Sequence, residues 1–579
     1  MGGNEVKLSD NAVVIAENRY FISGETWEEC TRRVGTEAGR VENGNANKYI
    51  EDFSEMIYNM DFLPGGRILR NSRRARGSLF NCYVLPVGDS REEIGQWLKD
   101  ALILWGEGGG VGCNMSFLRP RGAPIKGVGG NSSGPVSFLE ASDAVAGTIE
   151  SGGSRRAAAL ACMHVSHPDI LEFIDAKLTH GKLSHYNISV AVDENFLEAV
   201  ESDKDWQFKF AQQNYGTIKA REIWDKVIEN MVKCAEPGLL NWRNLQSNNS
   251  YYFDPILSTN PCGEVPLGSY GVCNLGSLVL SNFVKGRTTT NWKKMEYVLR
   301  LAVRFLDNII DINKYVLKEI DINAHNGRRI GIGVMGLAEY LFAKKLRYGS
   351  KEAIYEVERL MRFIRDIVYE ESIKLAMEKG AFPKFDPVNY GKAHFVRTLP
   401  AAMRMSIKKH GIRNVTLMAV APTGTISLLP EVTSGIEPLF LKAYLRSDRV
   451  SDRMYVHPIY KEALLNGTEK EIKEWFVDTS DLDPADHFET QAIIQKYVDG
   501  ALSKTINLPE DTTPEELSDL TLEYIYDLKG VTVYVDKSRE GQILNKVSEK
   551  EVKECVFENK ETTEDTMVRE CAAGNTCDI

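Results

Sequence analysis

Apolar residues follow two different spacings along the chain, and each spacing predicts a different kind of element. Intervals of three and four predict helices, over residues 27–34, 46–60, 95–105, 137–150, 223–235, 292–317 and 351–379. Short continuous apolar runs predict buried strands, over residues 83–87, 330–334, 415–420 and 531–535. Because helices alternate with short buried strands, the pattern indicates an α/β fold.

The chain shows no internal repeat and no clear linker before about Leu544. Residues 1–60 carry helical spacing only, whereas residues 64–134 are rich in glycine and in short apolar runs. After Leu544 the sequence is polar and charged with few aromatic residues, which is typical of a flexible tail. The pattern therefore predicts a helical region over 1–60, one large α/β domain over 61–544 and a flexible tail over 545–579.

Composition and charge exclude several classes of protein. Of the 579 residues, 43% are hydrophobic and 26% are charged, so disorder over most of the chain is excluded. The 70 basic residues against 81 acidic ones give a formal charge of −11, which argues against a general nucleic-acid coat. A local basic pocket could still hold a small polyanionic substrate. The sequence has neither a membrane-spanning apolar run nor a signal peptide, so we expect a cytoplasmic protein without membrane association.

Ten cysteines are too sparse for a disulfide scaffold, so each is either a small buried residue or chemically active. Cys262 stands between a proline and a glycine, which predicts the tip of a tight loop. In an extended loop Asn260, Cys262 and Glu264 would point to the same side and bring an amide, a thiol and a carboxylate together. A surface turn with a buried cysteine is the alternative, and the pattern alone leaves both open.

Four further cysteines draw attention by their positions. Cys273 lies eleven residues after Cys262, and Cys82 lies far upstream. Cys571 and Cys577 lie in the polar tail, where packing does not explain them but disulfide formation does. A thiol shuttle fits this last pair better than a zinc site, because the tail offers few further ligands. We expect no metal ion bound directly by protein side chains.

Two glycine-rich segments are candidates for phosphate binding. Residues 106–112 superficially match a dinucleotide-binding fingerprint, but the run follows a helical segment and not a strand, so the signal is weak. Residues 422–427 follow a predicted strand and offer three hydroxyls on a flexible backbone, which suits phosphate oxygens. They lack the Gly-Lys-Ser/Thr ending of an ATPase phosphate loop, and a simple Ser/Thr-rich turn is the alternative.

Together these segments resemble the catalytic subunit of ribonucleotide reductase, from about Leu8 to Leu544 and again in the tail. Several independent motifs occur in the order of that family, which chance does not explain. The matching motifs are the runs at 167–174, 260–264, 273–277, 329–338, 421–427 and 434–438. The resemblance implies a ten-stranded α/β barrel of two five-stranded halves, with Cys262 on a finger loop inside and a short helical region before it.

The resemblance also implies a role for each residue of the cysteine loop. Cys262 would be the thiyl radical that abstracts the 3′-hydrogen of a ribonucleotide. Glu264 would take the proton of the 3′-hydroxyl as general base, and Asn260 would hold the substrate hydroxyls. Cys82 and Cys273 would reduce the substrate and end as a disulfide.

Two further sets of residues receive roles by the same resemblance. Cys571 and Cys577 would reduce the active-site disulfide by exchange and be reset by a thioredoxin- or glutaredoxin-like protein. The substrate phosphates would contact Thr423, Gly424, Thr425, Ile426 and Ser427. A regulatory site would bind ATP or deoxynucleoside triphosphates and select the substrate base. The residues implied at this effector site are Asp89, Ser90, Arg119, Lys126, Arg155 and Arg156.

The branches of the family differ in how they make the radical. One branch uses a second, metal-containing subunit and two adjacent tyrosines, and another uses adenosylcobalamin. The run 529–535 has a single tyrosine at this place, Tyr534, followed by Val535, which cannot be oxidised as a tyrosine can. The resemblance therefore favours adenosylcobalamin as cofactor. Val535 in place of an arginine, and the five residues between the tail cysteines, depart from that branch.

Two alternatives stay open beside this interpretation. The chain could be a large subunit that needs a separate radical-generating metal subunit, or a nucleotide-binding regulatory paralogue without turnover. The expected partners are a ribonucleoside di- or triphosphate, nucleoside triphosphate effectors, a thiol reductant and a second copy in a homodimer. Residues 1–60 are too short for a full ATP-binding cone, so we expect no overall on/off activity site.

Overall fold

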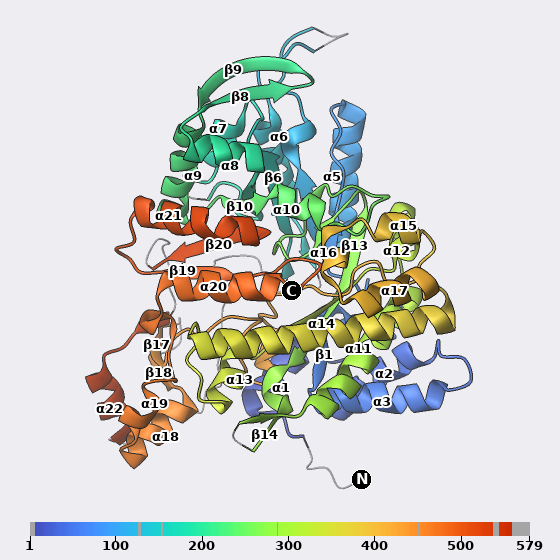
Figure 1. Ribbon diagram of the computed structural model, residues 1–579, viewed down its shortest axis with the longest axis vertical. Coiled ribbons are helices and arrows are strands. Elements are labelled where there is room, and N and C mark those ends of the chain that lie inside the picture. Colours follow the sequence, from blue (N-terminus) through green and yellow to red (C-terminus); the bar gives the residue numbers. More distant parts are fainter. Residues whose placement is uncertain are drawn as a thin grey trace.

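The structure is a computed structural model that describes residues 6–125, 129–151, 155–179, 181–286, 288–447, 452–536 and 544–557. Its main sheet has ten strands in the order β1-β13-β2-β3-β6-β7-β10-β20-β19, and β16 also pairs with β13. Figure 1 shows these strands in the middle of the molecule with helices around them. The strands are β1 (Phe62–Pro64), β2 (Cys82–Val84), β3 (Gly110–Asn114), β6 (Ala158–His164), β7 (Tyr186–Val192), β10 (Gly238–Asn241), β13 (Gly271–Val279), β16 (Ile330–Met335), β19 (Thr505–Leu508) and β20 (Gly530–Val535).

Apart from β1, which pairs antiparallel with β13, the sheet consists of two parallel runs. Strands β2, β3, β6, β7 and β10 form the first run, and the second begins with β13 and β16 and ends with β19 and β20. Antiparallel pairs join the two runs where β13 meets β2 and where β10 meets β20. The expected α/β class, with a large ten-stranded sheet, is therefore confirmed.

Residues 415–420 lie where a strand was predicted, but their pairing is reduced to isolated bridges. Met418 bridges Ile332 of β16, and Val420 bridges Leu502 just before β19. The amides of Leu417 and Met418 donate to the carboxylate of Asp499, each at 2.8 Å. The buried Asp499 carboxylate thus accepts backbone hydrogen bonds that a neighbouring strand would otherwise accept. For this reason the apolar run is buried but forms no regular strand ladder.

Helices occupy all seven segments in which helical spacing predicts them. Helix α14 ends at Lys379 as expected, because Gly380 follows with a left-handed φ of +85°. Helix α11 ends earlier than predicted, and Leu317 instead caps the next helix, α12 (Lys318–Gly327). No helix among the described residues is long and apolar enough to cross a membrane. The seven are α2 (Trp27–Gly39), α3 (Ala46–Tyr58), α5 (Arg91–Gly106), α6 (Pro135–Ala146), α9 (Ala220–Cys234), α11 (Trp292–Ile312) and α14 (Lys351–Lys379).

The region after residue 544 differs from the prediction of a tail that is flexible throughout. Strand β21 (Leu544–Lys546) pairs with β17 (Ala443–Ser447), and α22 (Glu549–Phe557) follows it. Val552 and Val556, four residues apart, place one apolar face of α22 in a small buried cluster. Residues 544–557 therefore carry a strand and a helix, whereas Cys571 and Cys577 lie outside the described residues.

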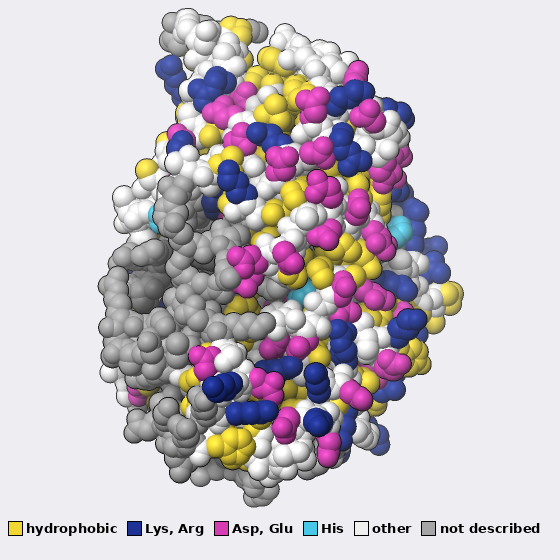
Figure 2. All heavy atoms as spheres, turned by 90° about the vertical axis from the view of Figure 1, so that its left-hand side faces the viewer, with side chains coloured by type: hydrophobic (Ala, Val, Ile, Leu, Met, Phe, Trp, Pro, Cys, Tyr) yellow, Lys and Arg dark blue, Asp and Glu magenta, His cyan; other side chains and the backbone are white. Residues whose placement is uncertain are grey.

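One face of the molecule shows how charge is distributed over its surface. In Figure 2 acidic and basic side chains alternate over the described part of this face, with small apolar groups between them. Such a mixture creates no strong field of one sign. This face therefore offers no continuous basic stripe of the kind that phosphate backbones need.

Candidate active site

A two-stranded hairpin carries the cysteine loop into the molecule. Its arms are β11 (Ser258–Thr259) and β12 (Pro266–Leu267), which pair antiparallel. At the tip the amide of Gly263 donates to the carbonyl of Asn260 at 3.0 Å, and Gly263 has a left-handed φ of +84°. Glycine adopts this conformation without the steric cost that a Cβ brings, so the predicted tight turn is confirmed.

Two residues of this loop converge on the thiol of Cys82. The side-chain amide of Asn260 lies 3.2 Å from the Cys82 sulfur, and that thiol lies 3.8 Å from Oε1 of Glu264. The Asn260 Oδ1 accepts the amide of Val265 at 2.9 Å, which holds the side chain in this orientation. All three side chains are buried. The structure thus brings together residues that lie about 180 positions apart, since Cys82 and Asn260 are separated by 178.

Cys273 belongs to the same buried cluster through sheet register. Strands β2 and β13 are antiparallel, and Cys82 stands directly opposite Cys273. Residues opposite each other in such a pair have Cα atoms about 4.5–5.5 Å apart, which lies within the range that a disulfide spans. None of the cysteines in the described residues forms a disulfide. Burial raises the pKa of the Cys273 thiol, so this thiol keeps its proton near neutral pH.

Burial also controls the protonation of Glu264. It raises the pKa of this carboxyl from its usual value near 4.5 to about 7, against the opposing effect of the Asn260 hydrogen bond. Oε2 of Glu264 has no hydrogen-bond partner among the described residues. A carboxyl that titrates near neutrality and has one oxygen available is suited to general acid and base catalysis.

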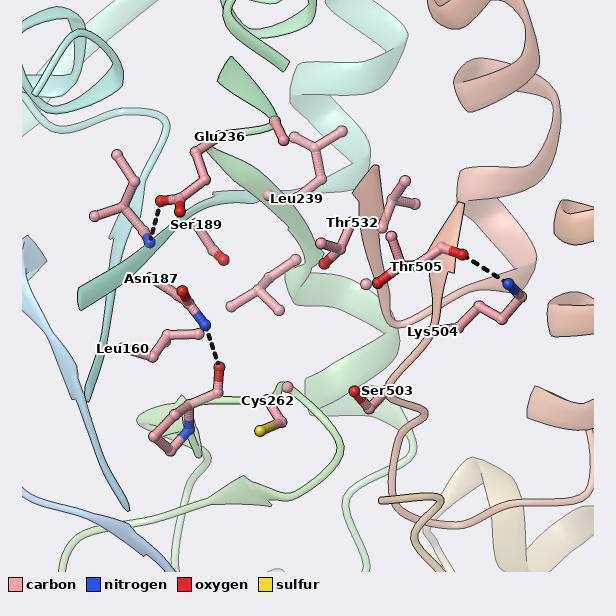
Figure 3. Close-up of a pocket in the computed structure, with 18 of the residues that line it drawn as sticks. Leu160, Asn187, Ser189, Glu236, Leu239, Cys262, Ser503, Lys504, Thr505 and Thr532 are labelled. Atoms are coloured by element: carbon pink, nitrogen blue, oxygen red, sulfur yellow. Dashed lines mark hydrogen bonds between the residues drawn. The ribbon is translucent and has the colours of Figure 1, made fainter. Parts of the chain in front are cut away.

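Cys262 stands at the tip of the same loop. The chain turns there at Gly263, where an extended loop was assumed from the sequence, and the convergence of the Cys262 thiol with Asn260 and Glu264 stays a prediction. Cys262 is half-buried and belongs to the lining of a cavity (Figure 3). Of the five predicted catalytic residues, Cys262 lines the cavity, whereas Cys82, Asn260, Glu264 and Cys273 are buried.

The cavity encloses about 870 Å³ of empty space, open solvent included. Its walls come from β7, β10 and β20, from the cysteine loop and from the chain that leads into β19. The lining combines apolar side chains with the hydroxyls of Ser189, Ser503 and Thr532. Among the described residues no group of three or more His, Cys, Asp and Glu side chains could hold a metal ion. A lining that combines apolar side chains with a few hydroxyls is typical of sites for organic ligands.

The predicted phosphate-binding segment lies next to the thiol pair. Ala421, directly before it, packs in one apolar cluster with Cys82 and Cys273. The Thr423 hydroxyl accepts the amide of Gly435 at 2.8 Å, and the Ser427 hydroxyl lies 3.2 Å from that of Ser434. These contacts connect two of the matching motifs, the runs at 421–427 and 434–438.

Three of the predicted effector residues are brought together. Arg119 forms an ion pair with Asp89 at 2.9 Å, and its amide donates to the same carboxylate. Ser90 caps the start of α5 by accepting the amide of Glu93 at 3.1 Å. Lys126 lies outside the described residues. Arg155 and Arg156 form β5, which pairs with β4 (Glu150–Ser151), and the structure describes only their backbone.

Two buried residues that support the site were missed at the level of sequence. Lys529 donates to the carbonyls of Asp499 and Gly500 at 2.7 and 2.5 Å, and burial lowers its pKa to about 7. The amide of the next residue, Ala501, donates to the Glu264 carbonyl at 2.8 Å. Lys529 and Asp499 thus hold the chain segment against which Glu264 rests. A charged residue at the edge of a buried strand, such as Lys529, is the signal that could have revealed this.

Comparison with known proteins agrees with the motifs quoted above. The sequence-family description "Ribonucleotide reductase, barrel domain" matches residues 80–535, and "Ribonucleotide reductase, all-alpha domain" matches residues 6–77. A "Vitamin B12-dependent ribonucleoside-diphosphate reductase" of Mycobacterium tuberculosis (strain CDC 1551 / Oshkosh) is 36% identical over 94% of this chain and 82% of its own length. A protein with the same description from Thermoplasma acidophilum is 37% identical over 88% of this chain and 69% of its own length.

Proposed function

Because the chain belongs to the ribonucleotide reductase family, we propose that it reduces ribonucleoside diphosphates to 2′-deoxyribonucleoside diphosphates with adenosylcobalamin as cofactor. The printed descriptions of the two relatives name vitamin B12 and a ribonucleoside diphosphate. The observation that carries the proposal is the buried cluster of Cys82, Asn260 and Glu264, with Cys273 opposite Cys82 and Cys262 facing a cavity.

Each residue of the site has a distinct task in the reaction. A thiyl radical on Cys262 takes the hydrogen atom from C3′ of the ribose and later returns it to the same carbon. Glu264 accepts the proton of the 3′-hydroxyl, and its unpartnered Oε2 is available for this bond. Asn260 holds the hydroxyls in place. These tasks place the C3′ atom between Cys262 and the carboxyl of Glu264.

The thiols of Cys82 and Cys273 supply the electrons for the reduction at C2′. The 2′-hydroxyl leaves as water, and Cys82 and Cys273 supply two electrons and two protons as their sulfurs join in a disulfide. One ribonucleotide and two thiols therefore give one deoxyribonucleotide, one water and one disulfide. The raised pKa of the Cys273 thiol keeps its proton on the sulfur until that step. Cys571 and Cys577 would then reopen the disulfide by thiol exchange with a thioredoxin- or glutaredoxin-like reductant.

The cavity beside Cys262 fits an organic cofactor of this kind. Gly238 and Gly530 present bare backbone there, and a Cβ on Gly238 would come within 3.2 Å of the Ser189 hydroxyl. The backbone of Gly238 and Gly530, which no side chain covers, would contact a nucleoside-sized group by shape. The hydroxyls of Ser189 and Thr532 would hold the same group by hydrogen bonds. When bound, adenosylcobalamin supplies the radical chemistry that turns the Cys262 thiol into a thiyl radical.

Regulation and assembly complete the proposal. The segment Thr423–Ser427 would bind the substrate phosphates, supported by its place next to the thiol pair. The region around the Asp89–Arg119 ion pair would bind ATP or deoxynucleoside triphosphates that select the substrate base, with Lys126, Arg155 and Arg156 as further contacts.

We propose a homodimer as the working form. Light scattering that shows a monomer at all effector concentrations would contradict the last point.

Turnover by the purified chain tests the main proposal. The assay supplies CDP or CTP, a matched effector and dithiothreitol, with and without adenosylcobalamin, and measures the deoxynucleotide. We expect product only with the cobalamin and none from Cys262→Ala. Product that requires an added metal-loaded subunit would favour the two-subunit alternative. Nucleotide binding without product in any combination would favour a regulatory paralogue.

A further inference from the structure

The rising arm of the cysteine loop lies along β3 residue by residue, in the opposite direction. The side-chain amide of Asn114 donates to the Leu257 carbonyl at 2.9 Å. One residue further along the arm, the Ser258 hydroxyl donates to the Cys113 carbonyl at 3.1 Å. Thr259 then passes over Gly112. The arm is thus guided by β3 up to the tip that carries Cys262.

Two glycines of β3 make this close approach sterically feasible. A Cβ on Gly112 would lie 1.8 Å from the carbonyl oxygen of Thr259, and a Cβ on Gly110 would lie 2.8 Å from Cγ of Pro261. Both distances are below any ordinary van der Waals contact. The glycine-rich run 106–112, which superficially matches a dinucleotide fingerprint, therefore has a different function here. It forms the seat on which the cysteine loop rests.

Asn187 contacts the tip of the loop from a different strand. It lies on β7, and its Nδ2 donates to the carbonyl oxygen of Pro261 at 3.0 Å (Figure 3). That carbonyl belongs to the peptide bond that links Pro261 to Cys262, so the hydrogen bond restrains rotation next to the reacting residue. Asn187 and Cys262 also line the same cavity.

We infer that Asn187 is a positioning residue for Cys262, and that Gly110 and Gly112 form the seat against which it holds the loop. The inference rests on the proposed function for its effect on turnover, but not for its effect on the loop. Without the Asn187 amide the Pro261–Cys262 peptide can rotate, and the Cys262 sulfur loses its fixed position. A reacting atom displaced by about 1 Å can slow a reaction about 10²-fold.

The test compares Asn187→Ala with Asn230→Ala. Asn230, on α9, is the control. Its buried side chain also donates to a backbone carbonyl, that of Ile174, at 3.0 Å. We expect Asn187→Ala to lower kcat roughly 10- to 100-fold with an unchanged KM. We expect Asn230→Ala to leave kcat unchanged. Asn187→Gln, which keeps the amide donor, is expected to recover part of the lost rate.

A second readout does not depend on turnover. Iodoacetamide modification of Cys262, followed by peptide mapping, reports how firmly the loop is held in the protein without cofactor. We expect severalfold faster modification of Cys262 in Asn187→Ala than in the wild type or in Asn230→Ala. A wild-type modification rate together with a wild-type kcat would overturn the inference. If the wild type itself shows no turnover, the proposed function fails, while the modification rates still decide the role of Asn187.

The seat is tested by Gly110→Ala against Gly95→Ala. Gly95 lies in α5, and a Cβ there would meet nothing within 4 Å. We expect Gly110→Ala to reproduce the faster Cys262 modification, because the added methyl pushes Pro261 away from β3. In Gly95→Ala, Cys262 is expected to be modified by iodoacetamide at the wild-type rate. Equal rates in both variants would overturn the role assigned to Gly110.

Discussion

The two sides of the cysteine loop differ in their exposure to water. On one side Cys82, Asn260, Glu264 and Cys273 are buried in contact with one another. On the other side Cys262 is partly exposed and faces a cavity that is open to solvent. Burial raises pKa values on the closed side and so sets the protonation states there. The open side is shaped by bare backbone and short side chains, which leave room for a ligand.

The largest expected effect comes from the one residue that faces the open side. Cys262→Ser should lose all measurable deoxynucleotide formation, because a serine hydroxyl does not form the radical that the reaction needs. Melting temperature and nucleotide binding should stay unchanged. The control is Cys30→Ala, which removes a buried thiol from α2 and should retain turnover. Residual turnover by Cys262→Ser would show that another residue carries the radical.

On the closed side, Cys273→Ser should stop repeated turnover. In the wild type without reductant, product formation should cease after stoichiometric amounts, and peptide mapping should reveal a Cys82–Cys273 disulfide. Cys273→Ser cannot form this bond, since only one sulfur remains. A disulfide between other cysteines of the described residues in the exhausted wild type would contradict the assigned pair.

Glu264→Gln should slow turnover roughly 10²- to 10⁴-fold, because the amide cannot accept the 3′-hydroxyl proton. Asn260 and Cys82 can keep their contacts with a side chain of the same shape. The pH profile of the wild-type rate should rise through about pH 7, the value to which burial raises the pKa of Glu264. A wild-type profile that is flat from pH 6 to 8 would contradict the role of base.

On the open side, Thr532→Trp should fill part of the cavity and weaken cobalamin binding about tenfold or more, which corresponds to about 1.4 kcal/mol. Absorbance titration measures this binding without turnover. Cys273→Ser lies on the closed side and should bind cobalamin as the wild type does. Weakened binding in both variants would show that the two sides are not separate.

The smallest effect concerns stability. Glu264 keeps its proton in the fold up to about pH 7 but loses it near 4.5 once unfolded. The folded state therefore binds more protons in this window, and stability falls as pH rises through it, by at most about 1.4 kcal/mol per pH unit. Urea denaturation from pH 5 to 8 should show this fall in the wild type relative to Glu264→Gln. Parallel curves would contradict the raised pKa.

The local sequence was sufficient to predict the helices and to identify the reactive residue types. Helical spacing and a terminal glycine are properties of neighbouring residues, which is why α14 has its predicted bounds. The Pro-Cys-Gly tip likewise predicts its own turn. The apolar spacing of Val552 and Val556 was also present, but a strongly polar context masked it, and α22 was missed.

Long-range contacts decided the rest. The register that places Cys82 opposite Cys273, and the carboxylate of Asp499 that replaces ladder bonds at Leu417 and Met418, join residues far apart in the chain. No local spacing encodes such pairings. The direction of Cys262 likewise depends on where β3 and β7 lie beneath its loop. The residue types needed for the chemistry can be read along the chain, but burial and backbone geometry, which arise only in the folded molecule, determine which groups meet and which face the cavity.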